Sequence, residues 1–251
     1  KFGSGVGLMV RALRDTPGST ADLGLPIQVG AMTQSNSGLI LVAGPTGSGK
    51  TTTVAAMVNE INESRHANIV TIEDPVEYVH ERKKAIINQR EIGMDVADFQ
   101  SGVKDALRFV PDVIVIGEIR DAETMRAALR AAESGHLVLA TMHAPSTTLA
   151  CRKVLGYMST PAESLSFATA LVGVINQCLL ADADGKKHLA YEVLNSRASQ
   201  GQVSQALASS ISDPSGSKLD SLDSMLRQGA LHHSSPMISS LRTLAKQSSF
   251  D

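Results

Sequence analysis

Residues 38–51, GLILVAGPTGSGKT, join a run of aliphatic residues to a glycine-rich loop. The run 38–43 contains no polar side chain, which is typical of a strand that is buried on both faces of a parallel sheet. The loop 44–51 matches the pattern G-x-x-x-x-G-K-[ST]. Glycines in such a loop let the backbone curl until consecutive N–H groups point at phosphate oxygens. The stretch therefore predicts a nucleotide-phosphate site.

The segment after the loop has the apolar spacing of a helix, with apolar residues at positions 54, 57, 58 and 61. The positive end of that helix would face the phosphates. Lys50 should reach the β- and γ-phosphates, and the Thr51 hydroxyl should ligate Mg²⁺, so we expect ATP and Mg²⁺ as cofactors. The expected nucleotide contacts are Gly44, Pro45, Thr46, Gly47, Ser48, Gly49, Lys50, Thr51 and Thr52.

Strand and helix patterns alternate along most of the chain. This alternation predicts an α/β fold with a mainly parallel, twisted sheet and helices on both faces. Besides 38–43, we expect strands at 68–72, 83–88, 112–116, 136–142 and 188–194, and helices after the glycine-rich loop and at 96–110, 122–134, 146–157 and 161–180.

The two ends of the chain differ from this central part. Residues 1–37 are rich in loop-forming residues and predict a linker from a preceding domain. After residue 195 serines become frequent and the apolar periodicity weakens. We interpret 196–217 as a mobile connection and 218–251 as a small helical tail, so the predicted main domain is 38–195.

Composition excludes several classes of protein. Hydrophobic residues make up 43% of the 251 residues, enough for a core, but aromatics make up only 3% and the net charge is −2. A nucleic-acid partner is not expected, because both stacking side chains and a basic surface are scarce. Cys151 and Cys178 cannot form a four-ligand zinc site by themselves, and they suggest a reducing compartment. No apolar run reaches membrane-spanning length, so direct membrane insertion is not expected.

A second acidic element follows the buried strand predicted at 112–116. Hydrolysis needs an oriented water and charge stabilisation beyond the phosphate grip. Gly117 stands where a metal-side aspartate is common, and Glu118 comes next, at the carboxyl end of the strand, where ligands bind in open α/β sheets. Glu118 is therefore a candidate for metal binding and for water activation. The alternative is that Glu118 caps the helix that begins near Asp121.

Three carboxylates crowd the end of another strand, in the segment Ile72-Glu73-Asp74-Pro75-Val76-Glu77. One of them could orient or deprotonate the attacking water while another holds the metal shell. We name Glu73 as a catalytic and metal-side candidate. The alternative is a solvated acidic turn.

Two histidines and two arginines complete the candidates. His136 and His143 bracket the strand predicted at 136–142, and a neutral histidine at a strand end can sense a γ-phosphate. The functional interpretation is stronger for His143 than for His136. Arg14 and Arg90 could stabilise charge on the transferred phosphoryl group, although most arginines only solubilise the surface.

Several motifs occur in the order found in one family. LVAGPTGSGKTTT, IVTIEDPVEYVH, INQRE, PDVIVIGEIRD and AAESGHLVLATMH resemble the motifs of the type II secretion and type IV pilus traffic ATPases, with the strongest likeness to the PilT-like retraction branch. In this family's terms the loop 44–51 is Walker A, 73–77 the Asp box, 113–118 an atypical Walker B and 135–143 the His box. The resemblance covers residues 11–194.

The resemblance implies a RecA-like ATPase domain that assembles into a homo-hexamer, with ATP held between this domain and a preceding PAS-like domain. It implies that Arg14 and Arg90 approach the nucleotide, and that Glu73 and Glu118 are the water-activating and metal-side acids, in an order that stays open. It also implies a cytoplasmic protein that works at the inner membrane through a platform protein of a pilus or secretion system.

Three features depart from the retraction branch or discriminate between branches. Phe109-Val110-Pro111 replaces a usually acidic stretch, and 202–207 is only a weak echo of the helix expected after Tyr191-Glu192. Two cysteines cannot supply the zinc site of the assembly-type enzymes. The predicted function is ATP-driven work on a type IV pilus, in the manner of retraction; the alternatives are an ATPase of a conjugative or type II secretion system and a nucleotide-binding regulatory module without hydrolysis.

Overall fold

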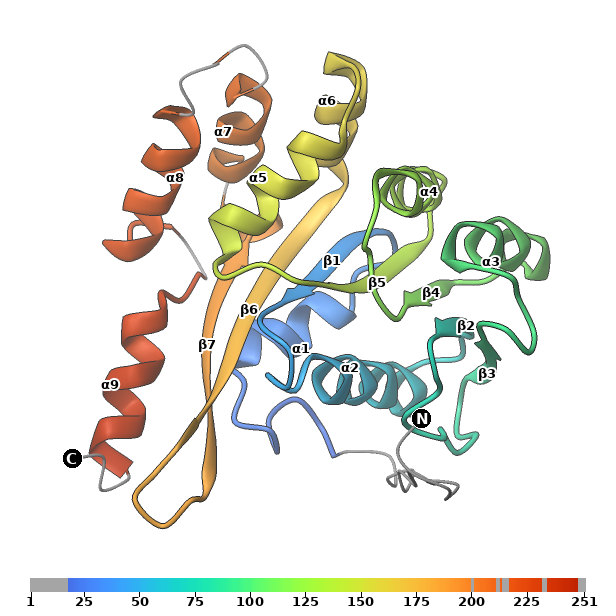
Figure 1. The fold of residues 1–251 in the computed structure, drawn as a ribbon, viewed down its shortest axis with the longest axis horizontal. Helices are drawn as coiled ribbons and strands as arrows, with labels where there is room; N and C mark the ends of the chain where they lie inside the picture. The colour runs from blue at the N-terminus through green and yellow to red at the C-terminus, as the bar shows by residue number, and fades with distance from the viewer. Residues whose placement is uncertain (1–17, 200, 211–212, 214–216, 232–233, 248–251) are drawn as a thin grey trace, which may run out of the picture.

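The computed structural model describes residues 18–199, 201–210, 213, 217–231 and 234–247. They form a seven-stranded sheet in the order β3-β2-β4-β5-β1-β6-β7 (Figure 1). Neighbouring strands from β3 to β6 are parallel, and β7 is antiparallel to β6. The predicted mainly parallel α/β fold is confirmed. The strands are β1 (Gly38–Ala43), β2 (Asn68–Glu73), β3 (Ile86–Glu91), β4 (Val113–Ile116), β5 (Leu137–Met142), β6 (Leu171–Ala181) and β7 (Lys187–Asn195).

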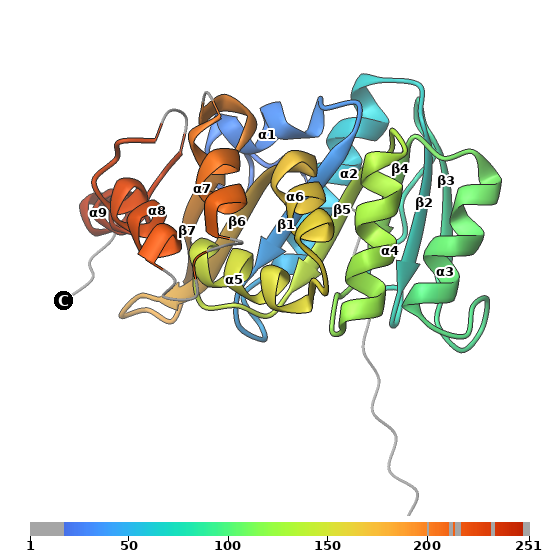
Figure 2. The same cartoon turned by 90° about the horizontal axis from the view of Figure 1, so that it is seen from above.

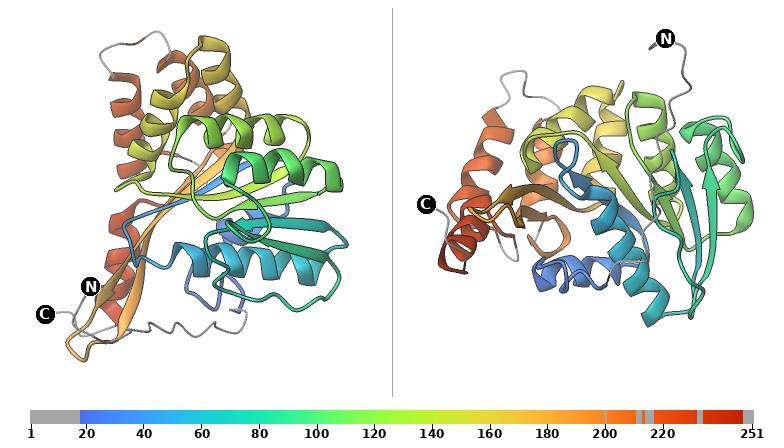
Figure 3. Two further views of the ribbon diagram at one scale, coloured as in Figure 1. Left: turned by 45° about the vertical axis from the view of Figure 1, so that its right-hand side comes forward. Right: turned by 60° about the horizontal axis from the view of Figure 1, so that its bottom comes forward.

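Helices cover both faces of the sheet (Figure 2). One face carries α1 (Ile27–Thr33) and α2 (Lys50–Ser64). The other carries α3 (Phe99–Ala106), α4 (Ala122–Glu133), α5 (Thr147–Tyr157) and α6 (Pro161–Ala170), with α7 (Gln202–Ser210) and α8 (Ser217–Arg227) packed beyond them. A long hairpin of β6 and β7 projects past the other strands, and α9 (Met237–Gln247) lies along β7 (Figure 3).

The alternation of side chains along each strand divides the core into two layers. In β1, Leu39 and Leu41 pack toward α4, whereas Ile40 and Val42 pack toward α2. All four are fully buried. A side chain of this kind contributes roughly 1.5–3 kcal/mol when it is fully buried. Because both layers need apolar side chains, the central strands appear in the sequence as unbroken aliphatic runs.

The prediction of a helix over 161–180 is wrong in its second half. Helix α6 ends at Ala170, and the chain continues directly into strand β6. The residues after Ala170 include Val172, Val174 and Ile175, whose branched side chains favour a strand. Pairing with β1 on one side and β7 on the other stabilises the extended form. A short apolar run cannot be assigned to helix or strand from its own periodicity.

The strand predicted at 83–88 lies three residues further on, as β3. Its register with β2 runs from Asn68 opposite Ile86 to Glu73 opposite Glu91. Lys83 and Lys84 do not join the sheet, because their backbone N–H groups donate to the side chain and the backbone carbonyl of Asn62 in α2. Partners in α2 therefore decide where the strand begins.

Both ends hold more helix than the sequence predicts. The stretch interpreted as a linker contains α1, whose Val29 and Met32 are buried. The stretch interpreted as a mobile connection contains α7, which buries Val203 and Leu207 against the core. The helical tail is present as α8 and α9. Residues 1–17 lie outside the described residues.

Within the part of the chain that the structure describes, we find no helix with the length and apolar character needed to cross a membrane.

Candidate nucleotide-binding and hydrolysis site

The glycine-rich loop connects the end of β1 to the start of α2. Gly44, Gly47 and Gly49 have φ values of 148°, 75° and 86°, in the region that side chains rarely adopt. A Cβ atom on Gly44 would lie 2.3 Å from the carbonyl oxygen of Gln177. Glycine at position 44 is therefore required both by its φ and by the close approach of β6. The curl that the sequence predicts is present.

Lys50 begins α2 and turns back over the loop. Its Nζ atom donates to the carbonyl oxygens of Gly44 at 3.1 Å and of Pro45 at 2.8 Å. Burial lowers the pKa of the Lys50 ammonium, and the negative charge of Glu118 acts in the opposite direction. A phosphate would offer this ammonium charged oxygens in place of neutral carbonyls, and such charge-assisted hydrogen bonds are stronger.

The loop also holds an unsatisfied hydroxyl. Ser48 is buried, and its Oγ atom has no hydrogen-bond partner among the described residues. Buried polar groups are nearly always paired, so an orphan inside a curl of glycines next to a lysine fits a loop that takes an anionic ligand. The residues present thus fit a nucleotide phosphate.

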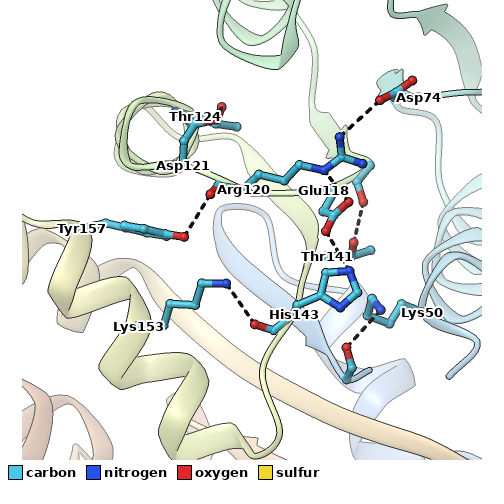
Figure 4. Close-up of polar contacts among 12 residues, drawn as sticks. Lys50, Asp74, Glu118, Arg120, Asp121, Thr124, Thr141, His143, Lys153 and Tyr157 are labelled. Atoms are coloured by element: carbon cyan, nitrogen blue, oxygen red, sulfur yellow. Dashed lines mark hydrogen bonds and ion pairs between the residues drawn. The ribbon is translucent and has the colours of Figure 1, made fainter. Parts of the chain in front are cut away.

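Glu118 lies at the centre of a charged network (Figure 4). One of its carboxylate oxygens lies 2.9 Å from Nε2 of His143, and the other accepts from Nε of Arg120 at 2.7 Å. Arg120 in turn reaches the carboxylate of Asp74 at 3.5 Å. Only 18% of the Glu118 side chain is exposed. The carboxyl ends of β2, β4 and β5 therefore meet in one ion-pair network, which the charge of Lys50 also reaches.

The structure contradicts the alternative interpretation of Glu118 as a helix cap. Helix α4 is capped by Asp121, whose carboxylate accepts from the N–H of Thr124 at 2.7 Å. Gly117 has a steric reason of its own: a Cβ atom there would lie 3.2 Å from the carbonyl oxygen of Ile72 and 3.3 Å from Cα of Glu73. A side chain at 117 would therefore crowd β2.

Glu73 ends β2 and is held from two sides. Its Oε1 atom accepts from the hydroxyl of Thr71 at 2.6 Å and from the amide of Gln89 at 3.1 Å. Burial raises the pKa of the Glu73 carboxyl, against the effect of these hydrogen bonds. The alternative of a solvated acidic turn does not describe Glu73, although Asp74 beside it is exposed.

Gln89, Arg120 and Gln177 are site residues that the sequence analysis did not single out. Gln89 connects Glu73 to the segment after the acidic turn, because it also donates to the carbonyl of Tyr78 at 2.8 Å and accepts from the N–H of His80 at 3.0 Å. A single polar residue of this kind has no distinctive local pattern. Its role depends on partners from other elements.

The segment after the acidic turn is itself well packed. Tyr78 is buried, and its hydroxyl lies 2.8 Å from that of Thr52 in the first turn of α2, so the acidic turn and the phosphate loop are connected. Burial lowers the pKa of His80 to about 4, so this ring is neutral near pH 7.

Arg90 and His136 lie away from this network. Arg90 is on the edge strand β3, separated from β1 by β2, β4 and β5. Its guanidinium donates to the carbonyl of Asp95 at 3.0 Å and lies 5.4 Å from the ring centre of Phe109. His136 precedes β5 at the opposite end of the sheet, where Nδ1 lies 2.9 Å from the carbonyl oxygen of Ala131. Arg14 is outside the described residues.

The candidate metal ligands Thr51, Glu73 and Glu118 do not form a cage. Among the described residues no group of three or more histidine, cysteine, aspartate or glutamate side chains is placed to hold a metal ion. Both oxygens of Glu118 already have basic partners. Thr51 follows Lys50 at the start of α2, where its hydroxyl fits the metal-side role only if phosphates supply most of the remaining ligands.

Comparison with known proteins places these features in a family. Residues 23–218 match the family described as "Type II/IV secretion system protein". The chain belongs to this family. It is 36% identical over 249 residues to the "Twitching motility protein" of Neisseria gonorrhoeae, which covers 98% of this chain and 64% of that protein. It is 39% identical over 195 residues to the "Type IV pilus retractation ATPase PilT" of Pseudomonas aeruginosa, which covers 76% of this chain and 56% of that protein.

A solved structure of a family member has the same architecture. The structure described as "Crystal Structure of the Pilus Retraction Motor PilT and Bound ADP" matches with a TM-score of 0.83 and 37% identity, covering 95% of this chain and 66% of that one. The fold is thus that of the PilT-like motors. The chain spans less than two thirds of the length of the two curated relatives described above.

Proposed function

We propose that this chain is the motor domain of an ATPase that couples ATP hydrolysis to mechanical work on a type IV pilus or a related secretion machine. One observation carries the proposal: the phosphate-loop lysine Lys50 and the Glu118–His143 ion pair lie at the same edge of the sheet. A phosphate grip and an acid that can act on water are the two elements that hydrolysis requires. The matched pilus retraction ATPase and the solved structure of a pilus retraction motor support the choice of a pilus or secretion motor.

The residues have separable roles in this proposal. The loop from Gly44 to Thr52 binds the triphosphate through backbone N–H groups, and Lys50 neutralises its charge. Thr51 would hold Mg²⁺ together with the phosphates, and Glu118 and Glu73 would be the acids on the metal side. The ion would screen the negative charge that develops on the phosphate oxygens. Either acid could take up the proton of the attacking water.

The surroundings of Glu73 and Glu118 favour a catalytic role for these acids. Burial raises the pKa of Glu73, which makes it a better proton acceptor than an ordinary glutamate. His143 and Arg120 hold the Glu118 carboxylate in one orientation through contacts to its two oxygens. Arg90 and Arg14 belong to the proposal as charge-stabilising residues. Arg90 is separated from β1 by the strands β2, β4 and β5, so it would act on a nucleotide bound by another subunit.

The assembly and its setting form the finer part of the proposal. The protein would work as a homo-hexamer in the cytoplasm, attached at the inner membrane to the platform protein of a pilus or secretion system. Residues 1–37 would be the end of a preceding PAS-like domain with its linker, and closure of the two domains around ATP would produce the movement. A role in a conjugative or type II secretion system would use the same chemistry on a different cargo.

The decisive experiment removes the lysine. Lys50→Ala should lower phosphate release by at least about 10³-fold, because the β- and γ-phosphates lose their main positive partner. Its circular dichroism spectrum and Tm should stay close to those of the unchanged protein. Lys104→Ala, at an exposed position of α3, is the matched control and should retain full turnover. Normal turnover in Lys50→Ala would refute the proposed function.

A further inference from the structure

Strand β6 places two buried amide side chains next to each other, Asn176 and Gln177. Consecutive residues of a strand point to opposite faces of the sheet. Gln177 points toward α2 and the phosphate loop, whereas Asn176 points toward the segment that joins β5 to α5. Strand β6 thus contacts both the phosphate loop and the segment that carries His143.

Gln177 contacts the phosphate loop and the first turn of α2. It is 0% exposed. Its Nε2 atom donates to the carbonyl oxygen of Ser48 at 2.7 Å, and its Oε1 atom accepts from the hydroxyl of Thr53 at 2.8 Å. Its backbone carbonyl sets the close approach to Gly44, and a Cβ atom on Gly49 would lie 3.3 Å from its amide nitrogen. Gln177 therefore lies against both the first glycine of the loop and its last residues before α2.

Asn176 contacts the segment between β5 and α5, which carries His143. It is 2% exposed, and its Nδ2 atom donates to the carbonyl oxygen of Ala144 at 2.8 Å. Ala144 directly follows His143, whose ring is paired with Glu118. The position of His143 therefore depends on a contact with β6.

The amide group suits the Gln177 position for a chemical reason. Its two partners are an acceptor, the Ser48 carbonyl, and a donor, the Thr53 hydroxyl. A glutamine satisfies both, whereas a glutamate would face the carbonyl without a proton and a methionine would satisfy neither. In a fully buried place an unmade hydrogen bond costs the full desolvation of the group, so the loop would shift.

We propose that Asn176 and Gln177 are paired positioning residues of the nucleotide site, which set the relative placement of the phosphate loop and His143. Gln177 fixes the direction of the loop N–H groups, and so controls nucleotide affinity. Asn176 fixes His143, and so controls the rate of hydrolysis. This inference rests on the proposed ATPase function.

Nucleotide affinity tests the first half. Gln177→Met keeps the volume and removes both hydrogen bonds, so the Kd for MgADP, measured by isothermal titration calorimetry on the full chain, should rise by about tenfold or more. Gln177→Glu should weaken binding further, because it adds a negative charge under the loop. Gln205→Met, the same exchange at an exposed position of α7, should leave the Kd unchanged.

Turnover tests the second half. Asn176→Leu removes the donor to Ala144 at similar volume, and kcat for phosphate release should fall by about tenfold with KM changed less than twofold. Gln177→Met should show the reverse, a raised KM with kcat nearly kept. A purely structural role for the two residues would lower Tm in both variants without this split.

The outcomes separate the two proposals. If the unchanged protein binds no MgADP and releases no phosphate, the proposed function fails. If the unchanged protein binds and hydrolyses but Gln177→Met and Asn176→Leu show no split between KM and kcat, the positioning proposal is overturned. Should Gln177→Met not fold, Thr53→Val removes one of the same hydrogen bonds from the other side, and a Kd for MgADP raised about threefold is expected; an unchanged Kd would overturn the proposal.

Discussion

The two ends of strand β5 carry the same residue type in opposite circumstances. His143 follows the carboxyl end, where its ring pairs with the carboxylate of Glu118 and is 44% exposed. His136 precedes the amino end, where its ring nitrogen lies 2.9 Å from the backbone carbonyl oxygen of Ala131 in the last turn of α4. Whether a histidine in this fold can take part in chemistry therefore depends on whether it lies at the carboxyl or the amino ends of the parallel strands.

The contrast extends beyond the histidines. At the carboxyl edge, acids meet bases: Glu118 meets His143 and Arg120. At the amino edge, polar side chains satisfy backbone groups: Asp112 accepts from the N–H of Asn68 at 2.7 Å, and Asn68 donates to the carbonyl of Phe109. In parallel sheets ligands bind at the carboxyl edge, so charge gathers there and the amino edge serves stability.

Substitution at the centre of the charged network should give the largest effect of the tests that follow. Glu118→Gln removes the charge at nearly constant shape, and kcat for phosphate release should fall by about 10²–10³-fold. Nucleotide affinity should change little, because Lys50 and the loop remain. Glu163→Gln, which breaks an ion pair with Arg126 away from the loop, is the matched control. An unchanged kcat would remove Glu118 from the chemistry.

The buried acid at the end of β2 should show a trade between activity and stability. Glu73→Gln should lower kcat by about 10²-fold, as expected for a lost general base or metal-side acid. Burial raises the folded pKa of Glu73 above its unfolded value, so the folded chain holds the proton more tightly in the window between the two. The contribution of Glu73 to stability is present below the unfolded pKa and is lost as pH rises through that window.

Glu73→Gln has no ionisable group at this position, so this variant does not lose stability there as the pH rises. Glu73→Gln should therefore melt at a higher temperature than the unchanged protein at pH 7, by about 2 °C, and at nearly the same temperature at pH 4. Thermal unfolding followed by circular dichroism at both pH values checks this. A variant that melts lower at pH 7 would contradict the assignment of burial as the dominant cause.

The histidine pair tests the contrast directly. His143→Ala should lower kcat by about tenfold, because Glu118 loses a partner that orients it. His136→Ala should leave kcat and KM unchanged and should cost about 1 kcal/mol of unfolding free energy, the value of one lost hydrogen bond. Steady-state kinetics and urea unfolding of both variants are the measurements. An equal fall in kcat for the two variants would contradict the distinction between the carboxyl and the amino ends of the strands.

The smallest effect is expected for a substitution that changes only the amino ends of the strands. Asp112→Ala leaves the N–H of Asn68 to solvent, and the unfolding free energy should fall by about 0.5–1.5 kcal/mol. Turnover at saturating ATP should stay within a factor of two. A loss of turnover larger than the loss seen for His143→Ala would show that the amino edge takes part in function.

Local sequence patterns predicted the centre of the molecule well. The runs that form β1, β4 and β5 are aliphatic because both of their faces are buried. Each residue of these strands is buried, so the sequence shows an unbroken apolar run. The glycine-rich loop could be recognised for a similar reason, since the φ values it needs admit few other residues. The candidate acids could be named from the sequence because Glu73 ends one such strand and Glu118 follows another by two residues.

Tertiary structure alone decided the rest. The apolar run after Ala170 is compatible with helix and strand, and pairing with β1 and β7 selected the strand. Gln177 joins Ser48 and Thr53 across more than a hundred residues, and Gln89 and Arg120 likewise gain their roles from partners on other elements. The sequence by itself determined which segments are buried and where the phosphate loop curls, because those properties depend on neighbours along the chain. Which polar side chains meet was decided in three dimensions, because a hydrogen bond between distant segments leaves no periodic trace in either one.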